Sequence, residues 1–453
     1  MEKPDPTLSV CTYRWNYPII NFDRLEFRHC CKTPAHKVDF SELRKKGEAY
    51  FSKNDLIIKR RQEMLDGIRH PECSACWQLE DKGIASFRNH AKKFSDYIDP
   101  GGQRLGESEA DHLRRLRKEK DLTSSIAPYT LEIVLDNTCN MKCIYCNEQF
   151  SSLWEQENIR FGLGKKQTAT PENLQQIHEL KDIFWNWLEQ GAIHEIDTIS
   201  LIGGEPFLNK DFYPLIHRLL TLAKDKKVKK YQIDLAIITN LNLNQRQLDS
   251  FKQILPELTE FFNVKLYLSM DSVGQRAEYI RFGLDWQRWN ENLDQLLSLK
   301  AENFHISFLI AVSALSVPTL QGFFEYLYQK YKHFNVPIYI KKIVVTEPAV
   351  HSFLCLPPSF SKSLDDASRF LETVEDEMDL ATAVNGSWKN FRIGLSEMSR
   401  ALASQQRNDM QMIEFFNWFS ANDRKRGHSL VEAFPELADF WSECSTKSPG
   451  ANP

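Results

Sequence analysis

The chain has 453 residues, which is enough to bury a large core and to form two or three domains. Its formal net charge is −4 and 26% of its residues are charged, so it lacks the basic balance of proteins that bind nucleic acid backbones. Residues 1–6 contain no apolar core like that of a signal peptide, and no later apolar run reaches membrane-spanning length. We therefore expect a cytoplasmic protein with neither nucleic acid nor membrane as a partner.

The ten cysteines indicate metal or redox chemistry, because the cytoplasm keeps thiols reduced and disfavours disulfides. Eight of them precede residue 147, and Cys355 and Cys444 stand alone. The eight form two groups, which are Cys11, Cys30, Cys31, Cys73 and Cys76, followed by Cys139, Cys143 and Cys146.

The first group contains a pair spaced by two residues, Cys73 and Cys76, and Cys11 with Cys30 or Cys31 would complete four thiolates. Four thiolates close either a zinc site or an iron–sulfur cluster, and the spacing alone favours neither. Adjacent cysteines cannot easily both bind one cluster, so one of the two neighbours is expected to be a bystander. We assign this group to a region over residues 1–97, followed by a polar and charged linker over 98–127.

The second group follows a predicted strand, and its three cysteines are spaced by three and then two residues. Structural zinc and iron–sulfur sites normally close with four protein ligands. Three thiolates on one strand-to-helix loop would bind three irons of a cubane and leave the fourth open. The spacing therefore favours a site that a small molecule completes.

Beyond this point, short apolar runs alternate with helical stretches, which is typical of βα units around a mainly parallel sheet. A helix is predicted to begin at Thr170 as the N-cap, with Pro171 in its first turn. We place this α/β region over 128–355 and a helical region over 356–453. The periodicity fits a partial barrel, a full barrel or an open doubly wound sheet. Six strands are predicted, at about 130–135, 197–202, 231–238, 264–270, 304–312 and 337–345.

Polar residues stand at the carboxyl ends of these strands, where parallel sheets present their ligand-binding loops. Gly203, Gly204 and Glu205 follow the second strand, although two glycines often serve only a turn. Asn240 ends the third strand. The fourth ends with Ser269 and Asp271, and Arg281 lies further on. Each of these residues alone could be an ordinary strand-end cap.

In combination, the cysteine triplet and the Gly203-Gly204-Glu205-Pro206 sequence resemble the radical S-adenosylmethionine (SAM) superfamily. The resemblance implies a partial (β/α)6 barrel and a [4Fe–4S] cluster, held by the triplet, that reductively cleaves SAM to a 5′-deoxyadenosyl radical. It also implies a reductant such as flavodoxin or ferredoxin. The SAM-binding residues that it implies are Gly203 and Gly204 at the methionyl moiety, Glu205 at its ammonium, Arg281 at its carboxylate, Asn240, Ser269 and Asp271 at the ribose, and Tyr145 beside the adenine.

The sequence around Cys73 and Cys76, together with the preceding residues 60–67, resembles the auxiliary-cluster module of twitch-type radical SAM proteins. In this chain the module would precede the barrel. The resemblance implies a second, auxiliary [4Fe–4S] cluster bound by the first cysteine group. It covers roughly residues 11–90 and 128–350.

Cys355 lies about ten residues past the sixth predicted strand, on the side where barrel loops form a catalytic face. A lone cysteine is usually a small buried hydrophobic residue. Similar proteins with the cluster module first are the peptide epimerases of proteusin biosynthesis, which use a lone downstream cysteine. The resemblance implies L-to-D epimerisation of a ribosomally made precursor peptide, in which the radical removes a Cα hydrogen and Cys355 returns one to the opposite face.

Two alternatives stay open. The same radical could drive a net two-electron oxidation, such as a cross-link or a dehydrogenation, with the auxiliary cluster as electron acceptor. The chain could instead be a metal-stabilised binding module without turnover, perhaps for RNA. Its acidic balance and the Gly203-Gly204-Glu205 match argue against this module.

Overall fold

The computed structural model describes residues 9–90, 129–164, 170–382, 387–406 and 408–448. The predicted linker over 98–127 lies outside these residues. Within them, none of the helices combines the length and the apolar character that a bilayer crossing requires.

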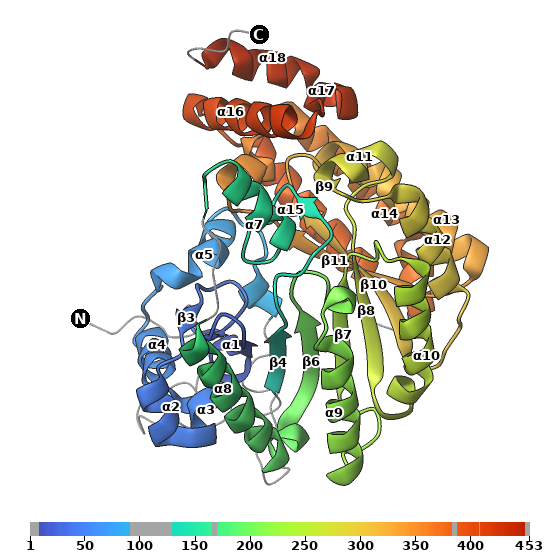
Figure 1. Ribbon diagram of the computed structural model, residues 1–453. Coiled ribbons are helices and arrows are strands. Elements are labelled where there is room, and N and C mark those ends of the chain that lie inside the picture. The colour runs from blue at the N-terminus through green and yellow to red at the C-terminus, as the bar shows by residue number, and fades with distance from the viewer. Residues whose placement is uncertain (1–8, 91–128, 165–169, 383–386, 407, 449–453) are drawn as a thin grey trace.

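The centre of the molecule is a nine-stranded sheet in the order β11-β10-β8-β7-β6-β4-β1-β2-β3 (Figure 1). The six predicted strands all form, and each pairs in parallel with the next one along the chain. The prediction of an α/β fold with a mainly parallel sheet is therefore confirmed. These strands are β4 (Tyr129–Val134), β6 (Ile196–Ile202), β7 (Asp234–Thr239), β8 (Asn263–Ser269), β10 (Phe304–Val312) and β11 (Ile338–Val344).

The N-terminal region extends this same sheet, which the sequence did not indicate. Strand β1 (Pro18–Asn21) pairs in parallel with β4, so that Ile19 lies opposite Glu132. Strands β2 (Glu26–His29) and β3 (His36–Lys37) then add in antiparallel fashion. These strands have four residues or fewer, too short for a hydrophobic alternation to stand out. The first cysteine group is consequently built onto the edge of the parallel sheet.

Helices cover one face of the parallel strands, because alternate residues of each strand point to opposite faces. On β4, Leu131 and Ile133 join the main hydrophobic core with Phe184 of α8 (Pro171–Glu189). The predicted N-cap is confirmed, since the Thr170 side chain accepts a hydrogen bond from the Asn173 amide. The other helices of this layer are α9 (Phe212–Asp225), α10 (Gln245–Phe261), α12 (Trp286–Leu297) and α13 (Leu320–Phe334).

The opposite, inner face of the sheet is lined with polar side chains. Lys265 on β8 forms an ion pair with Asp234 on β7. The Lys341 ammonium of β11 and the Glu132 carboxylate of β4 affect each other's pKa, although four strands separate β4 from β11. An interaction over that many strands requires the sheet to curve toward this face, since neighbouring strands are about 4.8 Å apart.

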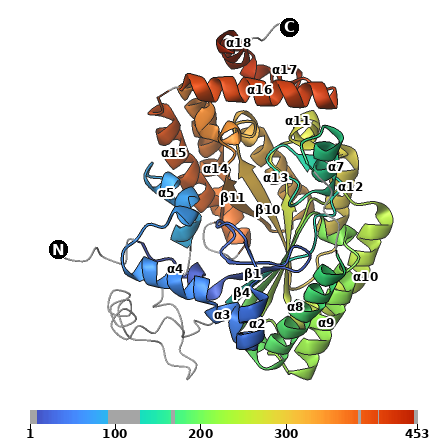
Figure 2. The ribbon, with the colours of Figure 1, turned by 60° about the vertical axis from the view of Figure 1, so that its left-hand side comes forward.

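The remaining helices lie at the two flanks (Figures 1 and 2). The N-terminal set comprises α1 (Tyr13–Asn16), α2 (Phe40–Lys46), α3 (Tyr50–Lys53), α4 (Asp55–Leu65) and α5 (Ser74–Glu80). The C-terminal set comprises α14 (Ser361–Thr382), α15 (Ser387–Ala403), α16 (Asp409–Arg426), α17 (Leu430–Ala433) and α18 (Ala438–Lys447). Figure 2 shows α16 crossing the molecule above α7 (Ser152–Arg160) and α11 (Gly274–Ile280). The C-terminal helices thus reach the end of the sheet where the loop after β4 lies.

Candidate functional site

The loop after β4 carries Cys139, Cys143 and Cys146, and hydrogen bonds hold it in place. A two-residue strand, β5 (Lys142–Cys143), pairs with β9 (Arg281–Phe282) in antiparallel fashion. The Cys146 amide donates to the Cys143 carbonyl at 3.0 Å. Trp154 of α7 donates its indole N–H to the same carbonyl at 2.9 Å. The loop is therefore an ordered part of the fold.

The three thiols share one environment. The pKa values of Cys139 and of Cys146 are raised to about 12, mainly by burial and also by the charge of Cys143. Two donors face the sulfurs: Asn240 Nδ2 lies 3.8 Å from Cys139 Sγ, and Arg281 Nη1 lies 3.6 Å from Cys143 Sγ. Half-buried thiols of this kind become thiolates when a metal supplies positive charge, and donors to sulfur are the usual surroundings of iron–sulfur clusters. The donor set therefore fits a cluster.

A single metal ion needs its ligands closer together than a cluster does. Across the part of the chain that the structure describes, no three His, Cys, Asp or Glu side chains are arranged to hold one ion. In a cubane each thiolate binds a different iron, which keeps the sulfurs farther apart.

Gly203 and Gly204 pack against the start of the cysteine loop. Gly204 N donates to the Asp136 carbonyl at 2.8 Å, and Glu205 N donates to the Thr138 carbonyl at 2.7 Å. A Cβ atom on Gly204 would lie 2.2 Å from the Thr138 carbonyl oxygen. A residue with a side chain would therefore push the two loops apart. This close packing explains the glycine at position 204, and an approach to a methionyl group stays a prediction.

Glu205 is 1% exposed and connects the ends of β6 and β7. Its Oε1 accepts a hydrogen bond from Thr239 Oγ1 at 2.7 Å, and its Oε2 accepts one from the Asn240 amide at 2.6 Å. Burial raises its pKa and these hydrogen bonds lower it, and the net pKa is about 7. A buried carboxylate is costly unless a cation compensates it, so a bound ammonium group would suit this position.

Asp271 joins two of the other predicted residues. Its Oδ2 accepts a hydrogen bond from Tyr145 at 2.5 Å and forms an ion pair with Arg281 Nη2 at 2.8 Å. Its Oδ1 accepts the Ala311 amide at 2.7 Å. Both oxygens therefore have partners within the protein, and a contact of Asp271 with the ribose stays a prediction.

Arg281 keeps donor capacity, as its predicted role requires. Its side chain is buried, its guanidinium lies 5.6 Å from the Tyr145 ring centre, and its Nε has no hydrogen-bond partner among the described residues. Ser269, the last residue of β8, is half-buried on the inner face of the sheet. The structure thus brings Tyr145, Asn240, Asp271 and Arg281 around the cysteine loop.

Arg426, the last residue of α16, belongs to the same site and was not predicted. Its guanidinium lies 4.5 Å from the Trp154 ring centre and 5.0 Å from that of Phe282. It donates to the Lys142 carbonyl and to Glu157 Oε1, both at 3.3 Å. Basic residues are common at the C-terminal end of a helix, because they interact favourably with the helix dipole. The sequence therefore gave no signal that distinguished Arg426.

Asn140 and Asn242 were also missed. Asn140 Nδ2 donates to the Asn242 carbonyl at 2.7 Å, and Asn240 donates to Asn140 Oδ1 at 2.9 Å. The alternating asparagines at 240, 242 and 244 were the available signal.

In the N-terminal region, four cysteines from three different segments approach one another. The pKa of Cys11 is raised to about 12, mainly by burial and also by the charges of Cys73 and Cys76. Cys30 interacts with Cys11 and also shares a hydrogen bond with Cys31. Burial and the Cys31 charge raise the pKa of Glu132 to about 7. Cys30 therefore faces the other cysteines, whereas Cys31 lies toward the inner face of the sheet.

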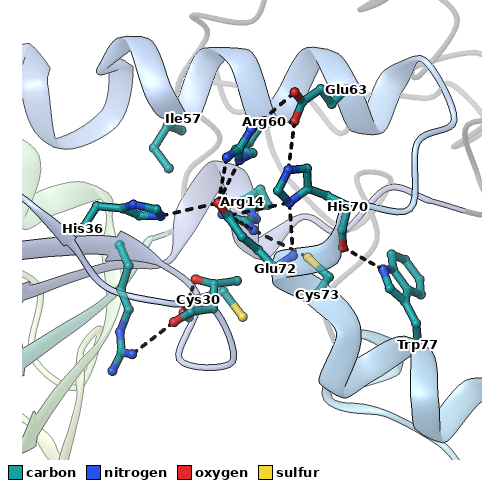
Figure 3. A network of polar contacts seen from close by, with 12 residues as sticks. Arg14, Cys30, His36, Ile57, Arg60, Glu63, His70, Glu72, Cys73 and Trp77 are labelled. Atoms are coloured by element: carbon teal, nitrogen blue, oxygen red, sulfur yellow. Dashed lines mark hydrogen bonds and ion pairs between the residues drawn. The ribbon is translucent and has the colours of Figure 1, made fainter. Parts of the chain in front are cut away.

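Arginines surround this group, as Figure 3 shows for Arg14. Arg14 Nη2 lies 3.5 Å from Cys73 Sγ and forms an ion pair with Glu72 at 2.9 Å. Glu72 is also held by Arg60 at 2.8 Å. The Arg88 charge lowers the pKa of Cys11. Positive charge beside buried thiols suits an anionic metal–thiolate group, whether zinc or iron–sulfur.

Cys355 lies in a short 3-10 helix (Phe353–Cys355) and is 8% exposed. Its thiol donates to the Val350 carbonyl at 3.6 Å. Burial raises its pKa well above the usual range, and the charge of Cys444 on α18 raises it further. The structure places Cys355 in the hydrophobic core that the C-terminal helices share.

Comparisons with known proteins agree with the site. Residues 133–313 match the family model described as the Radical SAM superfamily, so this part of the chain is a radical SAM domain, as predicted. The chain is 27% identical over 300 residues to the radical SAM cyclopropyl synthase TigE of Paramaledivibacter caminithermalis, a match that covers 64% of this chain and 55% of TigE. It is also 27% identical over 123 residues to the GTP 3′,8-cyclase of Campylobacter lari, covering 27% of this chain and 30% of the cyclase. The chain thus spans about half the length of TigE and less of the cyclase.

Among solved structures, anSMEcpe with bound AdoMet and the Kp18Cys peptide has a TM-score of 0.35 and 17% identity, with 55% of this chain and 61% of that chain covered. Streptococcus suis SuiB bound to the precursor peptide SuiA has a TM-score of 0.33 and 11% identity, with 94% and 74% covered. Neither likeness is close.

Proposed function

We propose that this chain, which contains a radical SAM domain, is a radical SAM enzyme in which Cys139, Cys143 and Cys146 hold a [4Fe–4S] cluster. When bound, the cluster and SAM supply a 5′-deoxyadenosyl radical. The supporting observation is one loop that presents three thiols beside the donors Asn240 and Arg281, at 3.8 Å and 3.6 Å from two of the sulfurs. Glu205 would hold the SAM ammonium and Arg281 its carboxylate, because one is a buried acceptor and the other a buried donor.

As the substrate we propose a ribosomally synthesised precursor peptide, and as the outcome L-to-D epimerisation. In this reaction a thiol gives its hydrogen atom to the Cα radical and becomes a thiyl radical. One electron from the reductant and one proton from solvent would then restore the thiol, and an auxiliary cluster held by the N-terminal cysteines would supply a path for that electron. Cys355 is the proposed donor, and to act it must exchange its contact with the Val350 carbonyl for one with the substrate.

A second outcome has its own support. Cys11, Cys30, Cys73 and Cys76 are all buried and lie on segments that meet, so they would close a cluster with four thiolates. A closed auxiliary cluster suits electron transfer. It would let the enzyme remove two electrons in total from the peptide, forming a cross-link or a double bond.

Anaerobic reconstitution with iron, sulfide and SAM tests the enzyme assignment, and we expect 5′-deoxyadenosine after a one-electron reductant is added. Incubation with a candidate precursor peptide in heavy water then separates the outcomes. Epimerisation incorporates one deuterium per converted residue, whereas oxidation removes two hydrogens.

Cys355→Ala should stop deuterium incorporation while SAM cleavage continues. Cys444→Ala is the matched control, because Cys444 is a fully buried neighbour in the same core. Equal losses in both variants would show that Cys355 matters only for packing.

A further inference from the structure

We propose that the ends of α7 and α16 form a docking surface for an acidic electron-carrier protein, which reduces the cluster at the loop after β4. This inference rests on the proposed function, because reductive cleavage of SAM requires an electron from outside the chain. One electron passes from the carrier to the cluster, so the carrier is oxidised, the cluster is reduced and no bond forms or breaks. The docking surface comprises the apolar residues Ile159, Phe161 and Leu163 and the basic residues Arg160, Arg424 and Lys425.

Exposed apolar side chains are concentrated where α7 ends. Among the described residues ten large apolar side chains are exposed, and three of them, Ile159, Phe161 and Leu163, fall within one five-residue stretch. They are 37%, 44% and 66% exposed. Single exposed apolar residues are ordinary on a protein surface, whereas a contiguous group with a polar rim marks a site of contact with another protein.

Cations flank this apolar group and have no acidic partner in the chain. The Lys425 ammonium lies 5.0 Å from the Phe161 ring centre, and the Arg160 guanidinium lies 5.8 Å from it. Arg424 precedes Lys425 on α16 and is exposed. Within the described ranges, none of these three cations forms an ion pair. Although the whole chain has a net charge of −4, the docking surface is therefore basic and suits an acidic protein.

The docking surface adjoins the cysteine loop. Asn158, the residue before Ile159, donates from Nδ2 to Glu148 Oε2 at 2.7 Å. Glu148 is two residues from Cys146, a span of at most about 7 Å along the chain. Residues 147–149 are exposed, and Cys146 itself is half-buried. A protein bound at the end of α7 would thus lie beside the loop that carries the cluster ligands.

The residue after Lys425 fixes α16 to α7 and to the same loop. Arg426 donates to the Lys142 carbonyl and to Glu157 of α7, both at 3.3 Å, and its guanidinium lies 4.5 Å from the Trp154 ring centre. Figure 2 shows α16 above α7. The last turn of α16 therefore packs on α7, which brings the basic and the apolar residues into one surface.

Isothermal titration calorimetry tests the docking surface without turnover, with the oxidised, reconstituted full chain and an oxidised flavodoxin of net negative charge as the probe. We expect the wild type to bind it. Binding should weaken at least about five-fold in Lys425→Glu, which reverses a charge, and in Leu163→Ser, which removes an apolar contact. Added salt should also weaken binding by the wild type, because it screens exposed charges.

Two reductants then separate docking from radical formation. Dithionite is a small anion that needs no docking surface, so both variants should form 5′-deoxyadenosine with dithionite at the wild-type rate. With reduced flavodoxin at a limiting concentration, the rate should fall at least about five-fold in both variants, in proportion to the weaker binding.

Lys229→Glu and Leu380→Ser are the matched controls, because both residues are exposed and lie at the opposite end of the sheet. Lys229 precedes β7. Leu380 follows Asp379, which accepts the Trp388 amide, and the Trp388 indole donates to the first residue of β11. Both controls should bind flavodoxin as the wild type does, and thermal unfolding of all four variants verifies that they fold.

Several results would overturn the docking surface. They are no binding of flavodoxin by the wild type, unchanged binding in both variants, and equal losses of rate with dithionite and with flavodoxin. A wild-type dimer that Leu163→Ser dissociates, or a precursor peptide that binds the two variants more weakly, would assign the surface to another occupant. A wild type that binds flavodoxin but forms no 5′-deoxyadenosine with dithionite would refute the proposed function and leave the docking surface standing.

Discussion

The two cysteine groups differ in how they are assembled. Cys139, Cys143 and Cys146 come from one loop and are half-buried. Cys11, Cys30, Cys73 and Cys76 come from three separate segments and are buried. A loop with three accessible thiols leaves a ligand position for a small molecule, whereas four buried thiols leave none. The difference supports the proposal that the loop generates the radical and that the N-terminal group serves electron transfer or structure, and separate substitutions test the two assignments.

The largest expected effect comes from Cys143→Ser. The hydroxyl is a poor iron ligand, and Cys143 lies between the other two cysteines with Arg281 directed at its sulfur. We expect at least about a 100-fold loss of 5′-deoxyadenosine formation, measured anaerobically. Cys444→Ala should retain full SAM cleavage. A Cys143 variant with wild-type cleavage would contradict the assignment of the loop.

The next largest effect is expected from a substitution that shows which of the adjacent residues Cys30 and Cys31 is a cluster ligand. Cys30 interacts with Cys11, and Cys31 interacts with Glu132 and Lys341, so Cys30 is the expected ligand. Cys30→Ser should lower the iron content from roughly eight to roughly four atoms per chain, as expected for the loss of one cubane. Cys31→Ser should leave it unchanged, and both variants should still cleave SAM in the absence of peptide.

Metal analysis of the same samples decides between zinc and iron. If zinc binds here, Cys30→Ser will lose zinc and keep its iron. Loss of iron in Cys31→Ser instead would reverse the assignment of the two residues.

Arg281→Lys tests the proposed role of Arg281 in binding SAM beside the cysteine loop. The lysine would keep the charge but lose the planar donor pair, one half of which is fixed by Asp271 at 2.8 Å. Hydrogen bonds to charged groups contribute about 1.5–3 kcal/mol, so we expect SAM to bind about 10–100-fold more weakly. Equilibrium binding of SAM measures this change. Iron content should stay at the wild-type level, and a parallel loss of iron would mean that Arg281 acts on the cluster instead.

Gly204→Ala tests the packing beneath the loop. The new methyl group would lie 2.2 Å from the Thr138 carbonyl oxygen, so the backbone must move. We expect the free energy of unfolding to fall by about 1–3 kcal/mol. Gly322→Ala is the control, because a Cβ there meets nothing within 4 Å and Gly322 lies inside α13. A helical alanine should stabilise by about 1 kcal/mol, and equal melting temperatures for the two variants would contradict the packing argument.

The contrast between the two groups also explains what the sequence could predict. The triplet, the Gly203-Gly204-Glu205 run and the six strands are local patterns, and each lies where it was predicted. Contacts between distant segments pair β1 with β4 and bring Cys11 near Cys73. The periodicity of the sequence does not predict such contacts. Arg426 is 284 residues from Lys142, whose carbonyl it contacts. Cys355 was placed by its distance from a strand, and that distance gave no information about the core around it.

Arg426→Met gives the smallest expected effect and tests whether the loop depends on its C-terminal cover as the N-terminal group depends on its arginines. Methionine keeps the apolar contact with Trp154 and Phe282 but loses the donors to the Lys142 carbonyl and to Glu157. Two hydrogen bonds are worth about 1–3 kcal/mol, and Lys142 still pairs with Glu157, so the loop should persist but open more often. We expect about a three- to ten-fold faster release of iron from the loop on exposure to a chelator, whereas Arg14→Met should speed release from the N-terminal group only. Because Arg426 contacts no sulfur among the described residues, the affinity for SAM at saturating iron should change by less than about two-fold. A larger change would mean that α16 contributes to the SAM site itself.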